Sequence, residues 1–76
     1  ATETASTFAF GADFITKISN DGTDDIIFNF DRDVSDPGAM TLKAGEVERN
    51  IPRRCSSISV KAKTGEQPFR IWGLKR

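Results

Sequence analysis

The most regular alternation in the chain is Ser57-Ile58-Ser59-Val60-Lys61-Ala62-Lys63, followed by Thr64-Gly65-Glu66-Gln67-Pro68 and then Phe69-Arg70-Ile71-Trp72-Gly73-Leu74. Apolar and polar residues alternate through both outer runs, which is the period of a half-buried β-strand. The five residues between them include Gly and Pro, so the stretch predicts a β-hairpin. One side of it would be mostly apolar and would need a second layer to cover it. That side consists of Ile58, Val60, Ala62, Phe69, Ile71 and Gly73.

The length of 76 residues allows one domain with a small core. A domain of this size buries only about 60% of the surface that its unfolded chain exposes. A single cysteine cannot form an intrachain disulfide, and without histidine there is no Cys/His set for a structural zinc. We therefore expect part of the stability to come from self-association or from docking on a larger structure, although domains of about 55–65 residues also fold alone.

The N-terminal residues lack the charged-then-apolar order of a signal peptide, and no apolar run approaches the roughly 20 residues of a membrane span. A start at Ala1 fits removal of an initiator Met or a trimmed start. The single thiol of Cys55 fits synthesis in a reducing cytoplasm. These features predict a soluble chain made in a reducing cytoplasm, with no membrane partner.

Charge is divided unevenly along the chain although the net charge is zero. Residues 1–38 hold eight acids and two bases, a net charge of −6, and residues 39–76 hold nine bases and three acids, a net charge of +6. Opposite charges could meet across strands within one molecule. Alternatively, an acidic patch on one copy faces a basic patch on the next, as in a heterologous, ring-forming contact. No nucleic-acid partner is expected, because the acidic half would repel phosphate.

The first 13 residues are small and polar except for Phe8 and Phe10. They predict an extended N-terminal arm at 1–13, followed by a single β-sandwich domain at 14–76. The two phenylalanines either cover the edge of the core or pack on a neighbouring subunit.

Four further runs in the domain have the alternation of strands: 14–19 with Phe14, Thr16 and Ile18 on one face, 25–30 with Ile26, Phe28 and Phe30, 39–43 with Met40 and Leu42 inward, and 47–51. The turn at 20–24 predicts a second hairpin between the first two runs. No segment has a helical period. The expected fold class is therefore all-β, a small antiparallel β-sandwich or jelly-roll-like barrel of six strands, or of seven with residues 8–10.

Few residues point to catalysis or metal binding. Without histidine, Ser-His-Asp and Cys-His arrangements are impossible. Arg53 and Arg54 could lower the thiol pKa of Cys55, but no base stands near it, so a structural thiol is expected. The acidic turn at 20–25 lacks the ligand spacing of an EF-hand. The aspartates at 31, 33 and 36 lie on a polar loop that we expect to be solvated. The sequence therefore predicts no catalytic residue, metal or cofactor.

Trp72 is the most informative exposed candidate, because the alternation of the last strand points it outward with Arg70 and Leu74. Three interpretations are open: the indole covers the edge of a thin core, anchors a protein interface, or provides a stacking platform for a sugar. A single aromatic residue among basic residues does not make a groove for single-stranded nucleic acid, which needs several stacking rings.

Four short segments between about residues 14 and 74 resemble a known group of proteins. The carrying segments are Met40-Thr41-Leu42-Lys43-Ala44-Gly45-Glu46, Ile51-Pro52, Ser57-Ile58-Ser59-Val60-Lys61-Ala62 and Pro68-Phe69-Arg70-Ile71-Trp72-Gly73. They resemble small virion proteins of tailed bacteriophages, in which a leucine-x-alanine-glycine-glutamate turn precedes two alternating strands. Arg53-Arg54-Cys55 and Trp72 depart from that pattern and leave the partner surface open.

The resemblance implies a capsid decoration or cement protein, or a short head- or tail-fibre module. Such proteins are typically homotrimers on the capsid surface. We therefore expect a non-enzymatic structural protein of the virion that self-associates and binds the major capsid protein or another virion protein. The candidate contact residues are Phe8, Phe10, Arg53, Arg54 and Trp72. The alternative is a carbohydrate- or receptor-binding β-module of a phage fibre, with Trp72 as its platform.

Overall fold

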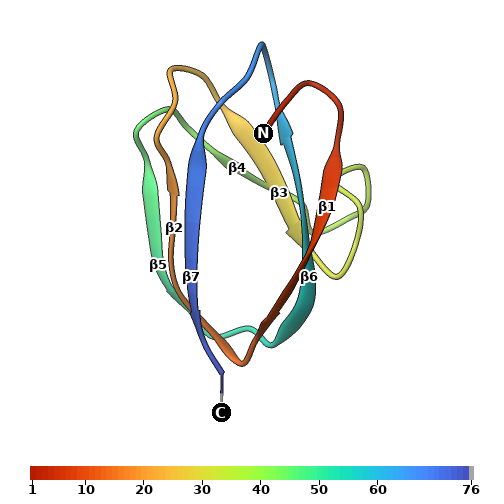
Figure 1. The fold of residues 1–76 in the computed structure, drawn as a ribbon, viewed down its shortest axis with the longest axis vertical. Helices are drawn as coiled ribbons and strands as arrows, with labels where there is room; N and C mark the ends of the chain where they lie inside the picture. The colour runs from red at the N-terminus through yellow and green to blue at the C-terminus, as the bar shows by residue number, and fades with distance from the viewer. Residues whose placement is uncertain (76) are drawn as a thin grey trace.

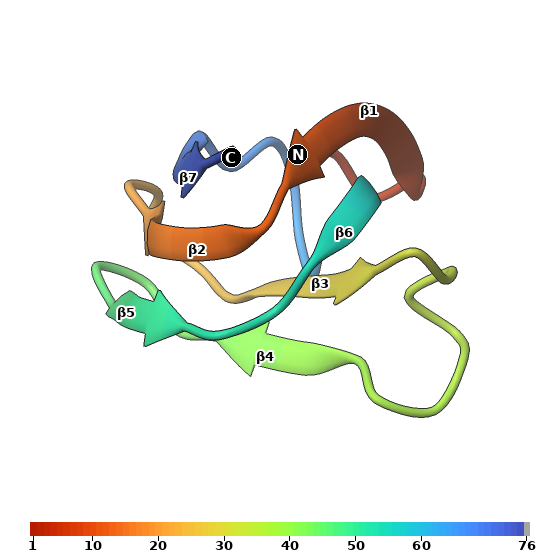
Figure 2. The same ribbon diagram turned by 90° about the horizontal axis from the view of Figure 1, so that it is seen from below.

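Seven antiparallel strands form two sheets in the computed structural model, which describes residues 1–75 (Figure 1). The last residue of the expected domain, at position 76, lies outside the described residues. The strands are β1 (Ser6–Ala12), β2 (Phe14–Asn20), β3 (Ile26–Phe30), β4 (Met40–Leu42), β5 (Val47–Ile51), β6 (Cys55–Ala62) and β7 (Phe69–Leu74). One sheet has the order β1-β6-β3-β4 and the other the order β5-β2-β7. This arrangement confirms the expected all-β class and is that of a small β-sandwich (Figure 2).

Both expected hairpins are wrong. β6 pairs with β1 and β3, whereas β7 pairs with β2, so the two strands of the closing stretch lie in different sheets. The strands on either side of the turn at 20–24, β2 and β3, are also in different sheets. Among the described strands, only β3 and β4 are both consecutive in the chain and hydrogen-bonded to each other.

The alternation could not reveal this connectivity. Alternation with a period of two indicates which side chains of a strand point inward, but it does not indicate which strand lies alongside. Sheets pack about 10 Å apart, and five extended residues reach up to about 17 Å, so both loops are long enough to cross the sandwich.

The core lies between the two sheets and is built mainly from β3 and β6. The predicted inward set of β3 is fully buried, and Phe28 and Phe30 make an edge-to-face contact with ring centroids 5.6 Å apart. Leu42 is buried as expected, but Met40 is 39% exposed. Met40 pairs with Phe28 and shares its face, but it lies on the short edge strand β4, where the opposite sheet does not cover it.

The predicted inner face of β2 is wrong in part, because only Ile18 of its three residues is fully buried. Ile15 and Ile18 are buried, whereas Thr16 is exposed. The pairing of β2 with β7 shifts between Ile15 and Lys17, so Thr16 is an extra residue that changes the phase of the alternation. Asn50 lies opposite this bulge on β5 with φ of 55°, a left-handed conformation that asparagine tolerates better than most residues.

The segment expected to be an arm is extended, but most of it is a strand of the domain. Ser6 to Ala9 pair with β6 in regular register, and Ala12 pairs with Cys55 after an irregularity. Ahead of β1, the amide of Ala62 donates to the Thr2 carbonyl at 2.6 Å. These bonds make residues 1–12 part of the first sheet and its margin rather than a separate arm.

Candidate functional site

The outer face of the β5-β2-β7 sheet gathers exposed apolar and basic side chains. Ile18 and its partner Ile71 point into the core, so their neighbours along each strand point outward. The register then places Val47, Ser19 and Arg70 in one row and Arg49, Lys17 and Trp72 in the next. Phe14 and Leu74 pair beyond them. We call this surface the Trp72 face, and its exposed or partly exposed residues are Phe14, Lys17, Val47, Arg49, Arg70, Trp72 and Leu74, whereas Ser19 is buried.

The apolar part of the Trp72 face is unusually exposed. Five large hydrophobic side chains are exposed among the described residues, and three of them lie on this face: Val47, Trp72 and Leu74. Trp72 is 41% and Leu74 61% exposed. Trp72 and Leu74 are two residues apart on β7, and Val47 lies on the opposite edge strand, so the apolar groups share one face with basic side chains between them. Apolar side chains grouped on one face and surrounded by polar residues are typical of an interaction site.

Two cations contact the indole of Trp72. The Lys17 ammonium lies 4.8 Å from the ring centroid, and the guanidinium carbon of Arg70 lies 5.2 Å from it. Lys17 faces Trp72 across the strand pair, and Arg70 is two residues before Trp72 on the same strand. Each distance is within the range of a cation–π interaction, which holds the indole in place while leaving part of it accessible.

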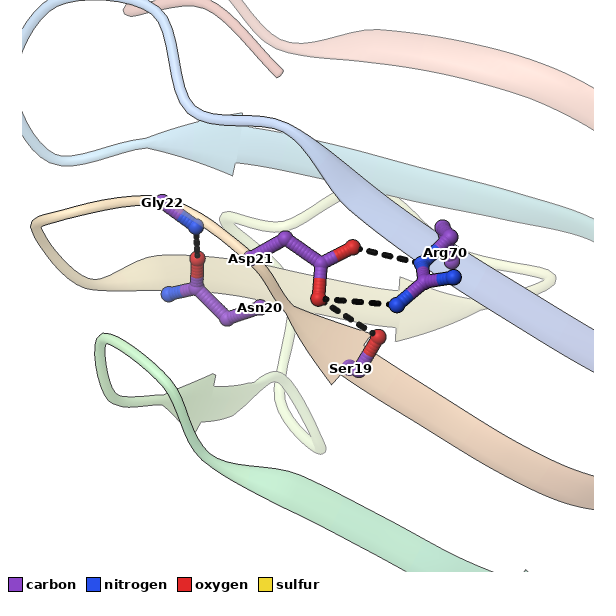
Figure 3. A network of polar contacts seen from close by, with 5 residues as sticks. All are labelled: Ser19, Asn20, Asp21, Gly22 and Arg70. Atoms are coloured by element: carbon purple, nitrogen blue, oxygen red, sulfur yellow. Dashed lines mark hydrogen bonds and ion pairs between the residues drawn. The ribbon is translucent and has the colours of Figure 1, made fainter.

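An acidic side chain neutralises one of the cations. The Arg70 Nε donates to Asp21 Oδ2 at 2.7 Å, and the Ser19 hydroxyl donates to Asp21 Oδ1 at 3.2 Å (Figure 3). The hydrogen bond from Arg70 lowers the pKa of Asp21 below its ordinary value of 3.8, and Ser19 and Lys17 act in the same direction. No ion pair within residues 1–75 involves Lys17 or Arg49, so the face remains basic.

The five predicted contact residues do not form one patch. Phe8 is 49% exposed on the edge strand β1. Phe10 is partly buried and packs against the core, where its ring lies close to Gly73. Trp72 is on the face just described, on the other sheet from Phe8 and Phe10.

Both arginines of the connector between β5 and β6 bind their own chain. Arg53 donates to the Phe30 carbonyl at 3.0 Å, with its guanidinium 5.8 Å from the Phe30 ring centroid. Arg54 forms an ion pair with Asp13 at 2.9 Å, although its side chain is 84% exposed. The pairs Arg54–Asp13 and Arg70–Asp21 each join the acidic first half of the chain to the basic second half. Some of the opposite charges of the two halves are therefore paired within one molecule.

Arg70 and Leu74 were expected to share the face of Trp72, but sequence reasoning did not bring Lys17, Val47 and Arg49 to it. A signal for two of them was present, because Val47 and Arg49 alternate with Glu48 along a strand. It could not be used, since nothing in the sequence indicates that β5 and β7 flank the same strand. Alternation with Ile18 already pointed Lys17 outward, but nothing in the sequence places β2 beside β7 and therefore Lys17 beside Trp72.

A surface cleft of about 310 Å³ lies beside Cys55 and is lined by Gly11, Ala12, Asp13, Arg54, Cys55, Ser56 and Lys75. The thiol is buried and donates to the Phe10 carbonyl at 3.3 Å. Burial, and secondarily the negative charge of Asp31, raises the thiol pKa, so the lowering that Arg53 and Arg54 suggested is not found. Cys55 is therefore poorly suited to act as a nucleophile.

The acidic segments are used locally. Asp31 adopts φ of 61° and accepts hydrogen bonds from the amides of Ser56 and Ser57, chiefly that of Ser56, which lower its pKa. In the turn after β2, Asp24 accepts a hydrogen bond from the Thr64 hydroxyl. Residues 1–75 contain no group of three or more His, Cys, Asp or Glu side chains placed to hold a metal ion.

Comparison with protein-family models, with curated proteins and with solved structures finds no match to this chain. Within the described part of the chain there is no helix long and apolar enough to cross a membrane.

Proposed function

We propose that this protein is a structural component of a tailed-phage virion, which self-associates as a homotrimer and binds the capsid surface to decorate or stabilise it. The observation that carries the proposal is the grouping of Val47, Trp72 and Leu74 with Lys17 and Arg49 on one sheet face. This face is the contact surface, and its role is binding without catalysis.

The composition of the Trp72 face is that of a protein interface. Tryptophan and arginine are enriched among the residues that dominate binding energy, and in a complex they are desolvated and surrounded by contacts that exclude water. Trp72 lies on the edge strand β7, where it pairs with Lys17 of the middle strand and contacts Arg70 on its own strand. A partner surface with acidic and apolar groups would complement it.

The stabilising effect on a capsid follows from mass action. A protein that binds the assembled shell but not its separated parts shifts the equilibrium towards the shell by RT ln(1 + [L]/Kd). Self-association adds to this effect, because several linked copies raise the effective concentration of each binding surface.

Two measurements test the proposal. Antibody raised against the purified protein should label the heads of phage particles isolated from the same source as the protein. Electron microscopy of the labelled particles shows where the antibody binds. Sedimentation velocity at micromolar concentrations should show a species about three times the mass of the 8.4 kDa chain. Trp72→Ala should weaken both head binding and self-association, while Lys61→Ala, an exposed change on the other sheet, should leave them unchanged. A monomer that labels no particle would overturn the proposal.

A carbohydrate- or receptor-binding fibre module is the second candidate, favoured by an exposed indole beside the polar pair Arg70 and Asp21. A sugar stacking on the ring would have to displace a cation wherever Lys17 or Arg70 covers it. A glycan array compared between wild type and Trp72→Ala distinguishes the two functions. Glycan binding that Trp72→Ala abolishes, together with antibody label on the tail, would favour the fibre module.

A further inference from the structure

We propose that the Trp72 face binds the loop between β3 and β4, residues 31–38, of a second copy of this chain. The inference rests on the self-association in the proposed function and names the two surfaces that meet. It would make the contact heterologous, with each copy offering its Trp72 face to one neighbour and its loop to another.

Two cations of the Trp72 face are not neutralised by an ion pair among residues 1–75. Arg70 is paired with Asp21, but Lys17 and Arg49 have no ion pair among residues 1–75. These two cations are partners in the register of β2 and β5, so they lie side by side, and Lys17 lies between Arg49 and Trp72. An acidic segment placed across this row would meet both charges and the indole together.

The loop has the opposite charge and is exposed. It contains Asp31, Arg32, Asp33 and Asp36, a net charge of −2, and no ion pair of the described residues involves any of them. Its remaining residues include Val34 and Pro37, which would add apolar contact area beside Trp72. Its charge therefore complements that of the Trp72 face.

The loop is already folded. The Asp36 amide donates to the Asp33 carbonyl at 3.0 Å, and the Asp33 amide donates to Asp36 Oδ2 at 3.1 Å. The Asn29 side chain also donates to the Asp33 carbonyl at 2.9 Å, which ties the loop to β3. A segment that is ordered before binding loses less conformational entropy on association than a flexible one does.

The two surfaces cannot meet within one molecule. The loop leaves the four-stranded sheet, and the Trp72 face is the outer side of the other sheet. In both views the loop lies on the side of the molecule away from β5, β2 and β7 (Figures 1 and 2). Each patch therefore requires another copy, and the chain of contacts ends only if rotation between copies closes a ring.

Complementary charge-reversal variants test the contact directly. Lys17→Glu/Arg49→Glu changes the face, and Asp33→Lys/Asp36→Lys changes the loop. Each variant alone should self-associate about tenfold more weakly than wild type or worse, because like charges then oppose each other. An equimolar mixture of the two variants should regain association in part, since the reversed face of one fits the reversed loop of the other, although a ring of three keeps one contact between like variants.

A third variant does not depend on keeping the loop's hydrogen bonds. Arg32→Glu removes the loop's cation, and no hydrogen bond or ion pair of the described residues involves the Arg32 side chain. It should strengthen self-association about threefold to tenfold at low salt, and the gain should shrink as salt screens the charges. The control Lys61→Glu reverses a charge on the other sheet and should leave the association constant within about twofold of wild type.

The outcomes separate this inference from the proposed function. If wild type self-associates and Trp72→Ala weakens it, but neither charge-reversal variant has an effect, the loop is not the occupant and the proposed function stands. If Lys17→Glu/Arg49→Glu loses binding to phage heads but self-associates as wild type does, the face binds the shell and the inference is overturned. Sedimentation of an unassociated wild type would overturn the inference, while head labelling would still decide the proposed function.

Discussion

The Asn20 side chain at the end of β2 donates a hydrogen bond to the Leu42 carbonyl at the end of β4, with 2.9 Å between Nδ2 and the oxygen. The two strands belong to different sheets. The same Nδ2 donates to the Asp24 carbonyl at 2.8 Å, and Asn20 Oδ1 accepts from the Gly22 amide at 2.9 Å. This buried side chain therefore holds the crossing loop between the sheets and satisfies its backbone groups.

Replacing Asn20 with alanine should lower the free energy of unfolding by about 2–3 kcal/mol, because buried carbonyl and amide groups lose their partners. This is a large part of the roughly 3–5 kcal/mol that a core of this size supplies. Urea unfolding followed by circular dichroism measures the loss. The exposed change Lys61→Ala should stay within about 0.5 kcal/mol of wild type. An equally small loss in Asn20→Ala would show that water replaces its hydrogen bonds.

The two phenylalanines of β1 should behave differently. Phe10 packs against the core and Phe8 is half exposed. We expect Phe10→Ala to cost about 2–3 kcal/mol, less than a fully buried phenylalanine, and Phe8→Ala to cost less than about 1 kcal/mol. Thermal and urea unfolding of the two variants compare them directly. Equal losses would mean that Phe8 also contributes to the core in solution.

Gly73 is required by a close approach between β7 and β1. A Cβ atom at this position would lie 2.8 Å from the Ala12 Cβ and 3.0 Å from the Phe10 Cζ. Gly73→Ala should therefore destabilise the protein by about 1–3 kcal/mol through overpacking. Gly11→Ala is the matched control, because its added methyl group would meet only the end of the flexible Lys75 side chain, at 3.4 Å. A Gly73→Ala protein as stable as Gly11→Ala would show that the strands separate without cost.

The ion pair between Arg70 and Asp21 should be visible in pH titrations. The pKa of Asp21 is lowered in the folded protein, chiefly by the hydrogen bond from Arg70. The pair therefore stabilises the fold fully above the ordinary value of 3.8, and this contribution is lost as the pH falls through the lower, folded value. NMR titration of the Asp21 carboxyl should show a midpoint below 3.8 in wild type that moves up in Arg70→Ala.

The matching stability experiment uses Asp21→Asn, whose unfolding free energy should fall less between pH 5 and pH 2 than that of wild type. Some acid sensitivity should remain, because hydrogen bonds from the Thr64 hydroxyl and the Ser56 amide lower the pKa values of Asp24 and Asp31, respectively. An unchanged Asp21 midpoint in Arg70→Ala would show that the pair does not persist in solution.

Part of the candidate site could be predicted from the sequence alone. Trp72 was expected to point outward because it alternates with Ile71, and it is exposed. Its neighbours Lys17 and Arg49 could not be assigned, because they come from strands 55 and 23 residues away in the chain. Arg53, Arg54 and Phe10 were expected to contact a partner, but their contacts within the chain became visible only once the strands were placed.

Local alternation was enough to identify the strands, because side chains on a strand point to opposite sides whatever lies next to it. The buried triplets Ile26, Phe28 and Phe30 of β3 and Ile58, Val60 and Ala62 of β6 follow from this rule alone. Strand order, the bulge at Thr16 and the Trp72 face depend instead on contacts between distant segments. Those contacts arise when crossing loops such as the one held by Asn20 carry the chain from one sheet to the other, a choice that no period of two can encode.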